Sequence, residues 1–120
     1  MQLVAVVDDD ESVRESLPDL LGELGFRSKV FSSAEEFLAA NNLSQMNCLV
    51  LDVAMPGMTG LDLQQELRNR GYKIPIVFIT ARKDETTRRR AVEQGAAGFL
   101  YKPFSDTALL GALNAALGLD

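Results

Sequence analysis

The chain has 120 residues, 47% hydrophobic and 24% charged, which is the size and composition of one globular domain with one core. Its 12 basic and 17 acidic residues give a net charge of −5, so by electrostatics alone it is a poor binder of nucleic acid, whose phosphates require a concentrated cationic surface. Cys48 is the single cysteine, which excludes an intrachain disulfide, and the absence of both a signal-peptide pattern and an apolar run of about 18 residues favours a cytoplasmic protein away from membranes.

The first part of the chain alternates short apolar runs with a helical pattern. Leu3–Val7 is typical of a strand, and so is Ser28–Phe31. Pro18 lies inside the intervening helix, where we expect a kink, because proline removes a backbone donor and crowds the carbonyl of Arg14. This helix ends at Gly25, and its apolar residues recur at helical spacing: Val13, Leu17, Leu20, Leu21 and Leu24.

Two later runs have the character of fully buried strands. Cys48–Leu51 and Ile74–Ile79 are continuously apolar and do not alternate with polar residues. Strands have this pattern when helices cover both faces of a parallel sheet. We therefore expect these two runs to be central strands.

Polar residues mark where the helices begin. Ser33 followed by Glu36 has the spacing of a capping box, in which each side chain bonds the backbone amide of the other residue. Further N-cap candidates are Asp10, Thr59, Asp84 and Ser105, and the helix-end glycines are Gly25, Gly71 and Gly95.

Together these segments predict five strands that alternate with five helices. With right-handed crossovers they form a doubly wound α/β fold with a five-stranded parallel sheet in the order 2-1-3-4-5, the flavodoxin-like (βα)5 arrangement. No linker or repeat interrupts the pattern, so we expect residues 1–120 to form one domain. The first and third strands are then neighbours, and ligands of such sheets bind beyond the carboxyl ends of the strands at that point.

Three carboxylates meet at this end of the predicted sheet. Asp8 and Asp9 follow the first strand, and Asp52 follows the third. Two unit charges about 4 Å apart repel by roughly 4 kcal/mol at an effective dielectric constant near 20. A hard divalent cation relieves this repulsion, and Mg²⁺ or Mn²⁺ takes such oxygen ligands. The sequence therefore predicts a metal site formed by these carboxylates.

The other strand ends carry groups suited to phosphoryl chemistry. Thr80 contributes a hydroxyl donor and Lys102 a fixed positive charge, and both can stabilise charge on a transferring phosphoryl group. Asp52, next to the metal, is the best candidate nucleophile, because aspartate carboxylates form covalent phosphoryl intermediates. The chain contains no histidine, so a phosphohistidine donor must be another protein.

Each of these residues also has an ordinary structural explanation. Asp10 and Glu11 would serve as the N-cap and first-turn charge of a helix whatever the function of the protein. Asp8, Asp9 or Asp52 alone could be a turn residue. The joint placement at four strand ends favours the functional interpretation over these explanations.

Four short motifs occur in order along the chain: Val-Val-Asp8-Asp9-Asp10, Leu-Asp52-Val-Ala-Met55-Pro56-Gly-Met-Thr-Gly60, Ile-Thr80-Ala81 and Lys102-Pro103-Phe104. As a set, from Gln2 to about Leu117, the chain resembles the receiver domain of bacterial two-component response regulators. The resemblance implies that a sensor histidine kinase phosphorylates Asp52 in a Mg²⁺-dependent reaction. Asp9 would bind the metal directly and Asp8 mainly through water, with the backbone carbonyl of Ala54 as a further ligand.

The resemblance also implies a conformational switch. Thr80 would turn towards the phosphoryl oxygen, Phe99 would turn inward behind it, and Lys102 would pair with the phosphoryl group. Ala81 would leave the space that these motions use. Phe99 lacks the hydroxyl of the tyrosine often found at this position, so the switch would work by packing. A cis peptide between Lys102 and Pro103 would aim the lysine at Asp52.

The implied role is that of a signalling domain, not an enzyme, which promotes its own phosphorylation and dephosphorylation. Its output surface would lie around residues 84–117. This surface would form a homodimer or bind a C-terminal DNA-binding domain outside this chain, and so regulate transcription. The pattern looks most like receivers joined to a LuxR-type helix-turn-helix. Ala54 and Arg82 occupy positions that vary within such families, so the resemblance does not imply a lifetime for the phosphorylated state.

Three alternatives remain for the same fold. In a Mg²⁺-dependent phosphohydrolase a second carboxylate would serve as general acid, but Ala54 occupies the position two residues after Asp52. In a flavin-binding domain a phosphate would have to lie among the three carboxylates. A pure interaction module would have lost phosphorylation. A cluster of basic residues is interpreted as a partner or dimer surface and not as a nucleic-acid site: Arg82, Lys83, Arg88, Arg89 and Arg90.

Overall fold

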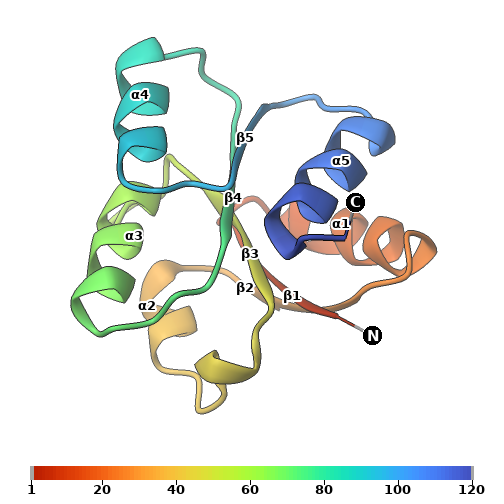
Figure 1. Ribbon diagram of the computed structural model, residues 1–120, viewed down its shortest axis with the longest axis horizontal. Coiled ribbons are helices and arrows are strands. Elements are labelled where there is room, and N and C mark those ends of the chain that lie inside the picture. The colour runs from red at the N-terminus through yellow and green to blue at the C-terminus, as the bar shows by residue number, and fades with distance from the viewer. Residues whose placement is uncertain (1, 120) are drawn as a thin grey trace.

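The computed structural model describes residues 2–119, which form a parallel sheet flanked by helices on both faces (Figure 1). The five strands lie in the order β2-β1-β3-β4-β5, as predicted. In chain order the elements are β1 (Leu3–Val7), α1 (Glu11–Glu23), β2 (Arg27–Phe31), α2 (Ala34–Leu38), the 3₁₀-helix η1 (Leu43–Gln45), β3 (Cys48–Asp52), α3 (Gly60–Asn69), β4 (Ile76–Thr80), α4 (Glu85–Glu93), β5 (Gly98–Tyr101) and α5 (Asp106–Leu117).

The two faces of the sheet bury two separate sets of side chains. Helices α2, α3 and α4 cover one face, where Phe37 and Leu63 pack with Leu51 and Phe78 of the strands. Helices α1 and α5 cover the other face, on the right in Figure 1, and this second set includes the following residues: Leu17, Leu21, Leu109 and Leu113 from the helices, with Val6, Cys48, Val50 and Ile79 from the strands. Every residue of β1, β3 and β4 is buried, which confirms the prediction of continuously apolar central strands.

Two predicted strand starts were inexact, and the third and fourth strands each extend one residue beyond their predicted ends, to Asp52 and Thr80. The strand predicted from Ile74 begins at Ile76. Pro75 precedes it and has no backbone N–H to donate to the ladder, although its carbonyl accepts from Leu49 N over 2.9 Å. The strand predicted from Ser28 begins one residue earlier, because Arg27 is already paired with Leu3 of β1.

The five predicted N-caps are confirmed, but the capping box was assigned to the wrong helix. Ser33 Oγ accepts from Glu36 N, whereas the Glu36 carboxylate accepts from Ser32 N and not from the Ser33 amide. The complete reciprocal box is at α3, where Thr59 and Asp62 bond each other's amides. The predicted helix-end glycines all have positive φ, and α1 continues through Pro18.

Helices α3 and α4 are joined by one buried polar contact. Gln64 is only 2% exposed, and its Nε2 donates to the carbonyl of Ala91, in α4, over 3.2 Å. The other amide atom, Gln64 Oε1, is buried and has no hydrogen-bond partner within residues 2–119. Ala91 is the only buried residue of α4, so this helix depends on few contacts.

Candidate functional site

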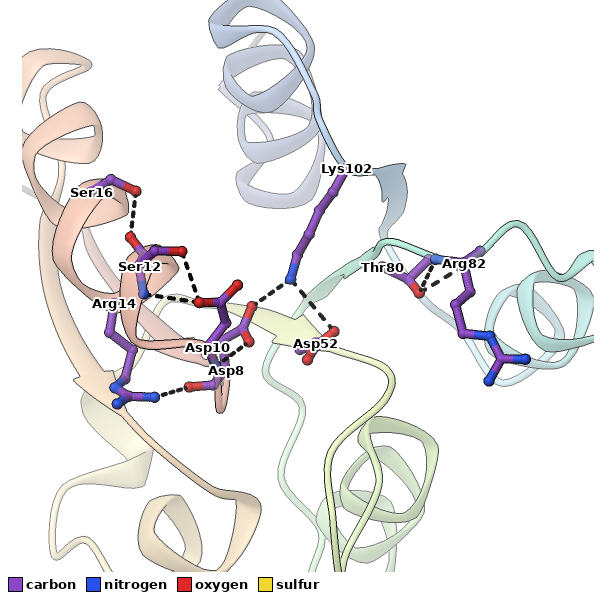
Figure 2. A network of polar contacts seen from close by, with 9 residues as sticks. All are labelled: Asp8, Asp10, Ser12, Arg14, Ser16, Asp52, Thr80, Arg82 and Lys102. Atoms are coloured by element: carbon purple, nitrogen blue, oxygen red, sulfur yellow. Dashed lines mark hydrogen bonds and ion pairs between the residues drawn. The ribbon is translucent and has the colours of Figure 1, made fainter.

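The carboxyl ends of β1, β3 and β5 bring the predicted acidic and basic residues together. Asp8 directly follows β1, Asp52 is the last residue of β3, and Lys102 directly follows β5. Figure 2 shows the Lys102 side chain pointing towards both aspartates. Its Nζ lies 2.9 Å from Asp8 Oδ2 and 3.8 Å from Asp52 Oδ1. The peptide bond between Lys102 and Pro103 is cis, as predicted.

Oxygen atoms of three carboxylates lie close enough to share one cation. One oxygen each from Asp8, Asp9 and Asp52 lies within 4.8 Å of the others. Asp8 and Asp52 are buried, whereas Asp9 is exposed to solvent. An all-oxygen set with one open side fits a hard divalent ion such as Mg²⁺, which retains water ligands. Ala54, whose carbonyl is the further predicted ligand, lies two residues beyond Asp52 in the loop that follows β3.

Asp52 is held in an environment that disfavours its charge. Burial raises the pKa of its carboxyl to about 7, the negative charge of Asp8 contributes in the same direction, and the Lys102 ammonium opposes both. A bound cation would favour the charged form. A positively charged ligand would therefore stabilise the ionised form of Asp52.

Asp8 is fixed by bonds to each of its polar groups. Its amide donates to Phe31 O over 3.1 Å, and its Oδ1 accepts from Asp10 N over 2.9 Å. Its carbonyl accepts from Arg14 Nη1 over 2.9 Å, as Figure 2 shows. With Lys102 on Oδ2, Asp8 has little remaining freedom and cannot easily rearrange around a ligand.

Asp10 serves as a helix cap, as the ordinary structural explanation predicted. Its Oδ1 accepts from both the amide and the hydroxyl of Ser12 at the start of α1. The bond from the Ser12 hydroxyl, followed by the bond from its amide, lowers the pKa of the Asp10 carboxyl. Of the three consecutive aspartates, Asp8 and Asp9 belong to the acidic cluster and Asp10 belongs to the helix.

Thr80 faces the loop after β4. Its Oγ1 accepts from Arg82 N over 3.2 Å and is 3.5 Å from Arg82 O, to which it donates (Figure 2). A small cavity of about 80 Å³ lies beside it, lined by Val53, Ala54, Thr80, Arg82, Asp84 and Thr87. The hydroxyl is thus bonded to its own loop, with space between it and the residues that follow Asp52.

Phe99 lies on β5 between two other aromatic side chains. Its ring centroid is 6.0 Å from that of Phe78 and 5.5 Å from that of Tyr101. Phe99 is only partly buried and packs against the core on the α2–α4 face of the sheet. The Phe99 ring is therefore neither fully buried in the core nor fully exposed to solvent.

Two residues that contribute to this site were not assigned a role from the sequence. Arg14 reaches back from α1 to the Asp8 carbonyl. Gly60 opens α3 so close to β3 that a Cβ there would lie 3.0 Å from Val53 Cα and would collide with the Asp52 carbonyl oxygen. For Gly60, the only signal in the sequence was its position at the end of one of the motifs that carry the family resemblance. Nothing in the sequence distinguished Arg14 from the other basic residues.

The chain was compared with protein families and with known proteins. The family model described as the response regulator receiver domain matches residues 4–114. The transcriptional regulatory protein TdiR of Thauera aromatica is 46% identical over 117 residues, which are 98% of this chain and 52% of that protein. Nodulation protein W of Bradyrhizobium diazoefficiens is 45% identical over 118 residues, again 98% of this chain and 52% of the relative. The chain therefore spans about half the length of these relatives.

Solved structures give the same result. The response regulator StyR superposes with a TM-score of 0.90 at 48% identity, covering 98% of this chain and 60% of that one. The crystal structure of FixJ-N superposes with a TM-score of 0.88 at 37% identity, covering 98% of this chain and 94% of that one. With the sheet order, the site geometry and the family model in agreement, the chain belongs to the response regulator receiver domain family of two-component signalling.

Proposed function

We propose that Asp52 accepts a phosphoryl group from a phosphohistidine of a sensor kinase, with Mg²⁺ or Mn²⁺ held by Asp8, Asp9, Asp52 and the Ala54 carbonyl. The observation that carries this proposal is the convergence of the three carboxylates with Lys102 at the carboxyl edge of the sheet. When bound, the metal would neutralise charge on the phosphoryl oxygens and on the carboxylates.

The transfer itself requires a nucleophile and stabilisation of charge from this chain. A carboxylate oxygen of Asp52 attacks phosphorus, an O–P bond forms, and the N–P bond of the phosphohistidine breaks. The electron pair of that bond leaves with the imidazole of the kinase. Lys102 lies 3.8 Å from Asp52 Oδ1 and can turn from Asp8 towards a phosphoryl oxygen. The same residues would promote the later hydrolysis of the acyl phosphate.

The proposed output is a switch that starts at Thr80. Thr80 Oγ1 would exchange its bonds with Arg82 for a phosphoryl oxygen, and the Phe99 ring would move into the space behind it. This motion would bias a two-state equilibrium of the surface formed by α4, β5 and α5. A change from 1:99 to 99:1 requires roughly 5.5 kcal/mol of differential stabilisation, so several new contacts must contribute.

The partner that binds this surface is also part of the proposal. A second copy of the chain or a DNA-binding domain in a longer protein would bind the altered surface and so regulate transcription. The relatives named as a transcriptional regulator and as a nodulation protein are about twice as long as this chain, which supports an attached output domain.

We further propose that residues 1–120 form one receiver domain that acts in the cytoplasm without direct contact with nucleic acid. No helix within residues 2–119 is long and apolar enough to cross a membrane.

The decisive experiment is chemical phosphorylation followed by mass spectrometry. With acetyl phosphate and Mg²⁺, the wild type should gain one phosphoryl group, and Asp52→Asn should gain none. Glu93→Gln, which changes an exposed carboxylate on α4, is the matched control and should be labelled like the wild type. If Asp52→Asn is still labelled, the phosphorylated residue is another one and the proposal is wrong.

A further inference from the structure

Arg14 forms two bonds to the loop that carries Asp8 and Asp9, two of the three clustered carboxylates. This loop, here called the acidic loop, consists of Asp8, Asp9 and Asp10 and joins β1 to α1. The Arg14 guanidinium donates from Nη1 to the carbonyl of Asp8 over 2.9 Å (Figure 2). The backbone amide of Arg14 donates to the carbonyl of Asp10 over 3.2 Å, which is the helical bond that any residue other than proline would form at this position. Of these two bonds only the one to Asp8 depends on the arginine side chain, which therefore ties the β1 end of the acidic loop to α1.

The remaining bonds of the acidic loop leave Asp9 between two fixed residues. Asp8 is bonded to Phe31 O through its amide and to Asp10 N through Oδ1. Asp10 is fixed by its bonds to Ser12. Asp9 is the exposed carboxylate of the cluster, and its position follows from the backbone on either side. Loss of the Arg14 side chain would free the Asp8 carbonyl and with it the peptide group between Asp8 and Asp9.

The charge of Arg14 is not used in an ion pair. Its guanidinium is within 4.0 Å of no carboxylate oxygen of residues 2–119, and its recorded side-chain partner is a neutral carbonyl. A positive charge near the acidic cluster would itself oppose a divalent cation there. The bond and the charge of Arg14 therefore act on metal binding in opposite directions.

We propose that Arg14 is a positioning residue for the metal, which holds the acidic loop so that Asp8 and Asp9 face Asp52. This inference rests on the proposed metal site. Outer residues that orient metal ligands commonly contribute a factor of 10 to 100 to metal affinity. For Arg14 the bond outweighs the charge, so removal of the side chain weakens metal binding although it also removes a repulsive cation.

The test compares Mg²⁺ and Mn²⁺ affinities of the whole chain by isothermal titration calorimetry. Arg14→Gln should raise the Kd about tenfold. Arg14→Lys keeps the charge and the ability to donate a hydrogen bond but not the planar guanidinium, and should raise the Kd by a smaller factor. Arg27→Gln removes the same charge from an exposed position at the start of β2 and is the matched control, with the Kd of the wild type.

A second measurement reports on the loop without any metal. In the metal-free chain, the amide of Asp10, which is bonded to Asp8 Oδ1, should exchange with solvent several times faster in Arg14→Gln than in the wild type. The amides of α5 should be unchanged and show that the fold is intact. A purely electrostatic role for Arg14 would leave the exchange at Asp10 unaltered.

The possible results separate the two proposals. An unchanged or tighter Kd in Arg14→Gln, with the wild type binding normally, would overturn the positioning role. Failure of the wild type itself to bind either ion would overturn the proposed metal site and this inference with it. Weaker binding in Arg14→Gln together with faster exchange at Asp10 is the expected result.

Discussion

Lys102 forms its shorter ion pair with Asp8 and not with Asp52. Its Nζ is 2.9 Å from Asp8 Oδ2, and the contact joins residues that are 94 positions apart in the chain. Asp52 Oδ1 is 3.8 Å from the same nitrogen, so the buried Asp52 carboxylate is less well compensated. Burial and the charge of Asp8 raise the pKa of Asp52 to about 7, and the Lys102 ammonium opposes them only in part.

The first prediction concerns the pH dependence of stability without metal. Because the pKa of Asp52 is about 7 in the folded chain and near 3.8 when unfolded, the folded state binds more protons between these values. The wild type should therefore lose stability as pH rises from about 4 to 7. Asp52→Asn has no such proton, so it should exceed the wild type by about 1–3 kcal/mol at pH 8 and by much less at pH 4. Urea unfolding with a chelator present measures this difference, and Glu93→Gln should show no comparable divergence.

The second prediction concerns stabilisation by metal. At ten times its Kd, Mg²⁺ should raise the free energy of unfolding by about 1.4 kcal/mol, because only the folded chain assembles the acidic cluster. Asp9→Ala removes the exposed carboxylate and should abolish the gain without harming the fold. Thermal melting with and without Mg²⁺ at constant ionic strength measures both effects. An equal gain in wild type and Asp9→Ala would mean that Asp9 is not a ligand.

The third prediction concerns the close approach of α3 to β3. Gly60→Ala should destabilise the chain by about 1–3 kcal/mol, because the new Cβ would press on the backbone of Asp52 and Val53. Gly111→Ala, in α5, would place its new Cβ within 4 Å of no atom beyond its chain neighbours and the backbone of its own helix, and should be neutral or stabilise the chain by up to about 1 kcal/mol. Urea unfolding of both variants tests the contrast; equal effects would contradict the contact at Gly60.

The fourth prediction concerns the buried amide between α3 and α4. Gln64→Met keeps most of the volume and removes the unpaired Oε1, while the Ala91 carbonyl keeps its bond from Ala96 N at 3.0 Å. The free energy of unfolding should stay the same or rise by about 1 kcal/mol. Gln64→Ala leaves a cavity and should lose about 2 kcal/mol. If Gln64→Met loses as much as Gln64→Ala, the Nε2 bond to Ala91 outweighs the cost of the unpaired oxygen.

Local patterns were sufficient to predict the sheet order and the position of the three carboxylates of the candidate site. Continuous apolar runs identify strands covered on both faces, and the order of the elements leaves few ways to connect them. Asp8, Asp52 and Thr80 could be placed together because parallel strands end at one edge of a sheet. The errors were local. The fourth strand begins at Ile76, after Pro75, and not at Ile74, and the Glu36 carboxylate accepts from the amide of Ser32 instead of that of Ser33.

The residues that were missed act through contacts that no local pattern encodes. Gln64 bonds a residue 27 positions away, and a glutamine on a helix is usually solvated. The φ of Gly60 is not positive; a glycine is needed there because α3 approaches β3 closely. Arg14 reaches backwards out of its helix, and only coordinates show which of several basic residues does so.

The position of Cys48 has a practical consequence for following the proposed switch. Its thiol is fully buried in β3 among side chains of α1 and α5, and burial raises its pKa to about 12. Thiol-directed dyes and spin labels react with the thiolate, so the native cysteine should stay unlabelled at neutral pH. A cysteine introduced at Val92, which is 49% exposed on α4, would thus be the sole reactive thiol and could report motion of that helix with every native residue but Val92 in place.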